Sequence, residues 1–329
     1  MRGGHGGARG FARRGWAAIA VTGMLLLTGC VGDAGGSGGA SAAPSSPQPS
    51  VTPTPTPPAE AVVPFGGDCA NVVADPASIL GGEAIASPLV GPDPIRTLGG
   101  IGCDWYDSTG ASLTVYVVPE TEVPTGLVGR YPAGACESAY DAYVCHISGT
   151  QEGMWAMVTM PASAGSDTPP TVLASVLDGV LDGVASWPIG VPAERTDDWW
   201  DPVDCANLGA VIDVTALMQG TEFYEGYPTG WGSHPISEVI EQAGVSEWCP
   251  WYSYELGGIW LTVYPGAGFQ WDLVEGTPVT VAGAESAVAT VVYDTSLVMA
   301  TDGTNIVTVQ EAPVPLEELA AKVIAALGR

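Results

Sequence analysis

The tetrapeptide Asp-Cys-Ala-Asn occurs twice in this chain, at residues 68–71 and 204–207. Cysteine is scarce, with 7 in 329 residues, so a repeated cysteine-bearing tetrapeptide indicates a repeated unit of structure. Further matches follow in the same order: residues 103–105 with 249–251, residues 113–116 with 261–264, and residues 134–139 with 283–287. We therefore predict two homologous domains, residues 62–188 and 202–329, joined by a connector at residues 189–201.

The same comparison predicts how the cysteines pair. Cys69 and Cys103 recur together as Cys205 and Cys249, whereas the second copy has no counterpart of the other two cysteines. Because partners are kept or lost together, we predict the disulfides Cys69–Cys103, Cys136–Cys145 and Cys205–Cys249. Free or metal-bound thiols are the alternative, but the chain has no Cys-x-x-Cys spacing. We expect no metal site and no cofactor.

Within each copy the pattern predicts a helix, then several strands, then a closing helix. Residues 112–118 and 260–264 alternate between apolar and other side chains with a period of two, as half-buried strands do. Asp302-Gly303 lies between two β-prone runs and predicts a hairpin, with residues 143–160 as its looser counterpart. The fold class is therefore α+β, with an antiparallel sheet, an N-terminal helix and a C-terminal helix in each domain.

Residues 1–29 have the features of a secretory signal peptide. Four arginines come before an apolar run at residues 16–27, which is short for a membrane span. Residues 27–30, Leu-Thr-Gly-Cys, resemble the lipobox of bacterial lipoproteins, which implies that Cys30 is lipidated and becomes the mature N-terminus. The alternative is a plain secreted protein with an unmodified Cys30. Residues 30–61 are rich in Gly, Ser, Thr and Pro and predict a disordered stalk.

The charge balance restricts the partners. Removal of residues 1–29 takes four of the nine basic residues and none of the 36 acidic ones, which leaves a net charge near −31. Nucleic acid and anionic lipid headgroups are poor partners for such a chain. We expect it on the outer face of the cytoplasmic membrane, held by the lipid on Cys30, where a glycan, lipid or protein of the envelope remains a suitable partner. Solubility alone also accounts for the acidity.

The combined features resemble a known class of protein. A lipobox, a Thr/Pro stalk, an N-terminal cysteine on a helix, a Cys-x-Trp strand entry, a Gly-Ala turn and a final amphipathic helix are similar to actinobacterial cell-envelope lipoproteins with a domain of unknown function. The extracellular sensor domains of actinobacterial membrane kinases have a similar disulfide-bearing plan. The resemblance implies an envelope location and a related fold, and it transfers no catalytic residue.

The sequence favours binding over catalysis. The cysteines are expected to be paired, and His146 and His234 fall in non-equivalent places, the first in a strand pattern and the second in a turn. We therefore predict a non-enzymatic binding or sensing module. A structural or docking partner of an envelope complex is the alternative, and an envelope hydrolase comes third.

A candidate ligand site lies where the two copies differ. The second copy is longer before its Cys-x-Trp motif, and aromatic residues gather there and on the following strand. They are Phe223, Tyr224, Tyr227, Trp231 and Trp260. Aromatic side chains on a loop or an outward strand face suit stacking on a sugar ring or enclosing an apolar group. The alternative is that they pack the domains together with Trp199 and Trp200. Trp105 and Trp251, at equivalent positions, are expected in the core.

Overall fold

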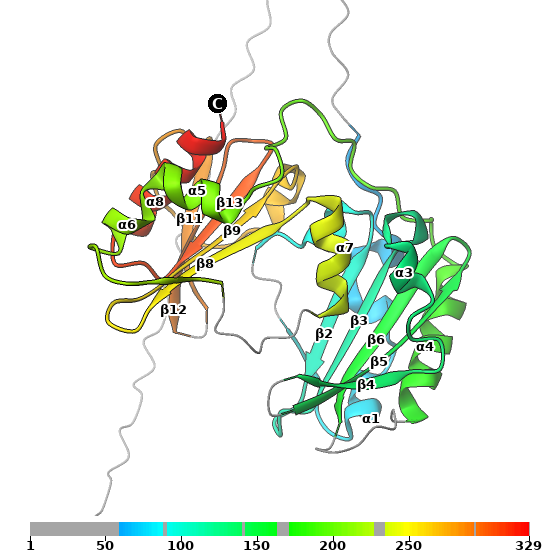
Figure 1. Ribbon diagram of the computed structural model, residues 1–329. Coiled ribbons are helices and arrows are strands. Elements are labelled where there is room, and N and C mark those ends of the chain that lie inside the picture. The colour runs from blue at the N-terminus through cyan, green and yellow to red at the C-terminus, as the bar shows by residue number, and fades with distance from the viewer. Residues whose placement is uncertain are drawn as a thin grey trace, which may run out of the picture. The chain divides into compact units, whose positions relative to one another are not determined.

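The computed structural model describes residues 59–87, 91–139, 142–162, 171–226, 234–292 and 294–328 (Figure 1). The predicted signal peptide, Cys30 and nearly all of the stalk lie outside the described residues. The fold is α+β, as predicted, with one antiparallel sheet of six strands and another of seven. Both sheets belong to one compact unit of the chain. In the described part of the chain, no helix has the length and apolar character needed to span a membrane.

The first sheet is built around the predicted β-hairpin and the strand that follows the first Cys-x-Trp motif. Its strands, in spatial order, are β1 (Ile85–Ala86), β2 (Ile101–Tyr106), β3 (Ser112–Pro119), β6 (Met154–Ala162), β5 (Ala142–Gln151) and β4 (Ala135–Ala139). Glu152 and Gly153 make the turn between β5 and β6 with φ angles of 50° and 75°. Positive φ at both positions gives the tight turn whose twist matches that of the flanking strands.

The second sheet contains the hairpin predicted at Asp302-Gly303. Its strands, in spatial order, are β10 (Thr277–Pro278), β11 (Ser286–Val292), β12 (Thr295–Thr301), β13 (Ile306–Gln310), β9 (Gly257–Tyr264), β8 (Glu247–Ser253) and β7 (Tyr224–Glu225). Gly303 has a φ of 95°, and the carboxylate of Asp302 accepts hydrogen bonds from the backbone N–H groups of Thr304 and Asn305 at 3.0 and 2.7 Å. These contacts hold the turn between β12 and β13.

The strand orders of the two sheets correspond. The run β1-β2-β3-β6-β5-β4 of the first sheet has the same order of connections as the run β7-β8-β9-β13-β12-β11 of the second, and β10 is an additional edge strand. This is the arrangement that a duplicated domain would have. The proposed homology of the two copies, and the boundaries at residues 189–201, remain predictions.

Each sheet has a hydrophobic core on its inner face. Helix α4 (Thr171–Val184) covers β5 and β6, while α5 (Cys205–Ile212) and α8 (Leu316–Leu327) pack together at the second sheet (Figure 1). Trp105 and Trp251 are 4% and 1% exposed in these two cores, which confirms their predicted place. Along α8, Leu319 and Val323 are fully buried, so the predicted closing helix has an apolar face on the core.

The N-terminal helix differs between the copies. Cys205 begins α5, which is followed by α6 (Val214–Leu217), but Cys69 lies in a short 3-10 turn, η2 (Cys69–Asn71), ahead of α1 (Pro76–Leu80). Two valines follow this turn, and their β-branched side chains lower helix propensity. Asp75 precedes Pro76 and is therefore disfavoured in helical geometry; its side chain instead caps α1 by accepting from the N–H of Ser78.

Three disulfides connect the residues that the sequence predicts: Cys69–Cys103, Cys136–Cys145 and Cys205–Cys249. Cys136 and Cys145 are direct cross-strand partners on β4 and β5. The other two bonds join the start of each copy to the strand that carries the Cys-x-Trp motif. Disulfides of this number are typical of a protein outside the cytoplasm.

The outer face of the first sheet is also covered. The other short elements of the fold are η1 (Pro64–Gly67), α2 (Pro94–Thr97), η3 (Glu120–Glu122), α3 (Thr125–Val128), α7 (Pro235–Ala243) and η4 (Gly268–Leu273). Phe65 of η1 lies in the inner core, whereas Ile95 of α2 and Leu127 of α3 belong to the outer cluster. Ile236 and Val239 of α7 are buried in one cluster with Trp155 and Met157 of β6. Helix α7, which precedes the strands β8 and β9 in sequence, therefore packs on the first sheet (Figure 1).

Candidate functional site

The outward side of β7, β8 and β9 carries a group of aromatic side chains. In β8, Cys249 and Trp251 are buried, so the alternate residues Trp248 and Tyr252 lie on the opposite face. We call the following five residues the aromatic face: Tyr224, Trp248, Tyr252, Tyr254 and Trp260. Tyr254, in the turn after β8, is 74% exposed, and Tyr224 is 49% exposed. Large aromatic side chains with this exposure are a feature of binding surfaces.

Two tryptophans form one part of the aromatic face. The rings of Trp248 and Trp260 are stacked, with centroids 5.7 Å apart and an interplanar angle of 12°. The indole N–H of Trp260 donates to Oε2 of Glu311 at 3.1 Å. Gly258 lies beneath the same ring, since a Cβ atom at this position would be 2.5 Å from Nε1 of Trp260. The carboxylate of Glu311 and the absence of a side chain at Gly258 therefore set the position of the Trp260 indole.

Three tyrosines form the other part. Tyr224 of β7 is the direct cross-strand partner of Tyr252 on β8. The ring of Tyr254 meets both of them edge to face, at centroid distances of 5.8 Å from Tyr224 and 5.3 Å from Tyr252. Trp248 and Tyr252 are four residues apart on β8, so the aromatic face extends about 13 Å along the strand, and Trp260 lies opposite Pro250, between them. The surface is long enough to contact more than one ring of a ligand.

The residues predicted for the ligand site fall in three places. Tyr224 and Trp260 belong to the aromatic face, whereas Phe223 is partly buried against the core of the second sheet, which accounts for it without a ligand. Tyr227 and Trp231 lie outside the described residues. Sequence reasoning missed Trp248, Tyr252 and Tyr254. The alternation in Glu-Trp-Cys-Pro-Trp-Tyr-Ser-Tyr, with the disulfide cysteine facing inward, was the signal that could have found them.

The connector tryptophans are structural. Trp200 is 3% exposed in the core of the second sheet, and its backbone N–H donates to Oδ1 of Asn305 at 2.9 Å. Trp199 lies against Gly266, and the guanidinium of Arg195 sits over its ring at 5.2 Å. Trp199 also packs on the cluster that contains α7. Trp199 and Trp200 therefore pack the connector against the rest of the fold, which is the role that the packing alternative assigns to them.

The structure brings together the two histidines that the sequence places far apart. His146 on β5 and His234 at the start of α7 have ring centroids 5.3 Å apart, edge to face. Nδ1 of His146 is 3.0 Å from the hydroxyl of Thr159, and Nδ1 of His234 accepts from the N–H of Ile236 at 3.4 Å. Burial lowers the pKa of His146. Burial, with a smaller contribution from His146, lowers the pKa of His234 to about 4.

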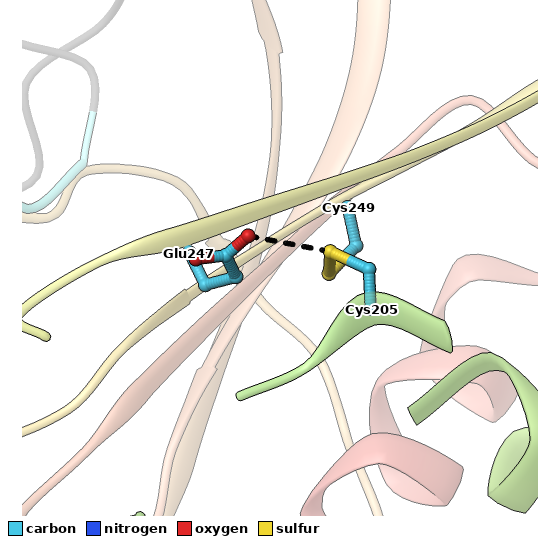
Figure 2. Close-up of side chains that lie close together, drawn as sticks. All are labelled: Cys205, Glu247 and Cys249. Carbon is cyan, nitrogen blue, oxygen red and sulfur yellow. Dashed lines mark hydrogen bonds between the residues drawn. A yellow bond between two sulfur atoms is a disulfide. The ribbon is translucent and has the colours of Figure 1, made fainter. Parts of the chain in front are cut away.

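One group of three potential ligand side chains exists among the described residues: Cys205, Glu247 and Cys249 (Figure 2). The two sulfur atoms form a disulfide, so neither is a thiolate that could bind a metal. Oε1 of Glu247 lies 3.5 Å from Sγ of Cys205. Burial, together with the charges of Glu241 and Asp204, raises the pKa of Glu247. The residues present do not fit a metal ion while the disulfide is intact.

A scan against protein-family models finds no match for the chain, and searches of the curated proteins and of the solved structures find none either.

Proposed function

We propose that this protein is a lipid-anchored, extracytoplasmic lipoprotein that binds a neutral glycan of the cell envelope on its aromatic face, without turnover. In this proposal Cys30 carries the lipid, residues 30–61 form a stalk, and residues 62–188 and 202–329 are homologous copies of one domain. The three disulfides support a location outside the cytoplasm. The resemblance to actinobacterial envelope lipoproteins supports the anchor.

The observation that carries the proposal is the aromatic face itself. Sugar rings have apolar C–H faces that stack on the flat faces of Trp and Tyr, while their hydroxyls bond to polar groups at the edges. Trp260 is oriented by Glu311, and the phenol of Tyr254 is largely in solvent. A ring system that is already held in place loses little conformational entropy on binding.

Charge favours a neutral ligand. The chain without its leader has a net charge near −31, and two acidic residues lie at the aromatic face: Glu311, which accepts from Trp260, and Glu255, which follows Tyr254 in the chain. An anionic polymer would be repelled by this field. A neutral polysaccharide would not, and its binding would depend little on salt.

A docking role in an envelope complex is the second candidate function. Tyr and Trp are enriched at protein interfaces as well as at glycan sites, and the exposed Tyr224–Tyr254 pair would suit either. An envelope hydrolase is less favoured, because burial lowers the pKa of His146 and of His234 and so makes both weak bases, and because each uses Nδ1 within the fold.

The proposal is tested by binding measurements on the full-length chain. The probes are purified peptidoglycan, a neutral soluble polysaccharide, an anionic polysaccharide, and phosphatidylcholine vesicles. We expect saturable binding to a neutral glycan, and a loss of tenfold or more when Tyr224 and Tyr254 are both changed to Ala, since stacking contributes about 1 kcal/mol for each ring. Both side chains are exposed, so the fold should be kept.

Val291→Ala is the matched control. Val291 is 66% exposed on β11 and lies away from the aromatic face, so this variant should bind as the wild type does. Binding to neither glycan class, together with specific capture of one envelope protein through Tyr224 and Tyr254, would favour the docking role. Release of shortened glycan products would favour the hydrolase.

A further inference from the structure

Helix α7 is held on the first sheet by an interface that combines an apolar centre with a polar edge. Ile236 and Val239 are buried against β6. At the edge, Arg130 forms an ion pair with Glu238 on α7, and its Nη2 donates to Oε2 of Glu238 at 2.8 Å. This exposed ion pair adds little stability, so the apolar contact and its neighbours decide whether α7 stays docked.

The two histidines lie inside this interface. His146 comes from the first sheet and His234 from the first residue ahead of α7, so their contact exists only while α7 is docked. The ring of Tyr131 is tilted against that of His146 with centroids 5.3 Å apart, and the ring of Tyr116 meets that of His234 edge to face at 5.6 Å. The chain has 3 histidines, and the third, His5, is in the predicted leader. Histidine titration in the mature chain therefore belongs to this pair.

The charged and titratable groups around His146 and His234 do not offset the positive charge that a second proton on this pair would add. Glu137 on β4 faces His146 and raises its pKa, but burial has the larger effect. Tyr131 donates its hydroxyl to Glu137 at 2.8 Å, which partly occupies that carboxylate. The remaining neighbours are Tyr116 with Asp93 and Asp104 close to it, Thr159, Arg130 and Glu238. Arg130 and Glu238 balance each other.

We propose that the His146–His234 contact is an acid-sensitive joint, which keeps α7 docked on the first sheet at neutral pH and releases it when the surroundings become acidic. The proposal is independent of the glycan site. Protonation of either ring puts a charge into a buried interface beside another imidazole, and protonation of both adds direct repulsion. Release of α7 returns both rings to water.

The direction of the pH effect follows from the pKa values. The docked state lowers both histidine pKa values, so the released state binds more protons, and docking weakens as the pH falls from 6.5 toward 4. For His234 alone, a change in pKa from 6.5 when exposed to about 4 when docked makes docking about 30-fold weaker at pH 5 than at pH 7.5.

Titration of Asp93 changes the stability in the opposite direction, so its contribution to the pH dependence must be separated from that of the histidines. Burial raises the pKa of Asp93 to about 6, so protonation of this carboxyl strengthens the fold as the pH falls. Asp93 lies at another contact, where its backbone bonds to Gln270 of η4. Asp93→Asn keeps the capability to cap Ile95 and removes this titration, which makes it a useful background for the test.

The test is amide hydrogen exchange of the full-length chain at pH 7.5 and pH 5, corrected for the intrinsic exchange rates. A nine-residue helix is marginal in water once it is undocked, so release of α7 should expose its amides. We expect the protection of residues 239–243 to fall by tenfold or more at pH 5. Helix α8 has no histidine contact, and its protection serves as the reference within the same molecule.

The matched variant is His146→Asn with His234→Asn. Asn places a polar atom near the position of Nδ1 and keeps the capping capability of residue 234, but it does not titrate. In this variant, with or without Asp93→Asn, the protection of α7 should change by less than about threefold between the two pH values. An equal acid-induced loss in the variant would overturn the proposal.

A measurement on the unaltered chain covers the case in which the variant does not fold. The imidazole C–H resonances of His146 and His234, followed by NMR during a pH titration, should show both pKa values below 6.5 and a transition that coincides with loss of α7 protection. Two histidines that titrate near 6.5, or an α7 that stays protected at pH 4, would overturn the acid-sensitive joint.

Discussion

Asp93 and Gln270 are 177 residues apart in the chain and exchange two hydrogen bonds. The backbone N–H of Asp93 donates to Oε1 of Gln270 at 2.9 Å, and Nε2 of Gln270 donates to the carbonyl of Asp93 at 3.0 Å. Gln270 is 1% exposed and also donates to the hydroxyl of Thr97. This amide side chain thus replaces three hydrogen bonds to water, and it ties η4 to the start of α2.

We expect Gln270→Ala to lower the free energy of unfolding by about 2 to 4 kcal/mol, because it leaves buried polar groups of Asp93 and Thr97 unpaired and opens a cavity. Urea denaturation followed by far-UV circular dichroism measures the change. Gln242→Ala, at an exposed position of α7, is the control and should stay within about 0.5 kcal/mol of the wild type. Equal stability of the two variants would contradict the structural role of Gln270.

The disulfides should differ in their contribution according to loop length. Cys205 and Cys249 close a loop with a sequence separation of 44, whereas Cys136 and Cys145 are separated by 9. In the chain-entropy account, replacing the first pair by Ala costs about 4 kcal/mol and replacing the second costs about 2.5 kcal/mol. Urea denaturation of both double variants tests the ranking, and non-reducing peptide mapping of the wild type checks the pairing.

The anchor prediction rests on a single thiol. If Cys30 accepts a lipid, Cys30→Ser should move the protein from the membrane fraction to the soluble extracytoplasmic fraction, because no other residue at the cleavage site offers a thiol. Fractionation with immunodetection measures this change. Membrane association as firm as that of the wild type would mean that the Leu-Thr-Gly-Cys sequence does not act as a lipobox.

Gly258→Ala should disturb the aromatic face without removing an aromatic residue. The new Cβ would lie 2.5 Å from Nε1 of Trp260, so the indole must shift away from Glu311 and from its stack with Trp248. We expect a weaker near-UV circular dichroism signal and a several-fold loss of glycan binding. Gly126→Ala is the control, since no atom lies within 4 Å of a Cβ at that position. Unchanged spectra would show that Trp260 adapts freely.

What the sequence by itself determined is the local and repeated part of this protein. The paired recurrence of Cys69 and Cys103 as Cys205 and Cys249 predicts the disulfides, and Asp302-Gly303 predicts a hairpin. Each of these features depends on residues close in the chain, or on a comparison of which cysteines the two copies share and which they lack. The alternation that predicts the inner face of β9 is local in the same sense, because side chains on a strand point to opposite faces in turn.

Only the tertiary structure decided which distant surfaces meet. His146 and His234 are 88 positions apart in the numbering, and neither sits in a pattern that refers to the other. They come together because α7 buries an apolar face on the first sheet. A helix with such a face can bury it against any apolar surface of suitable shape. Burial of that face favours docking in general, while the partner surface depends on shape and packing across the whole fold.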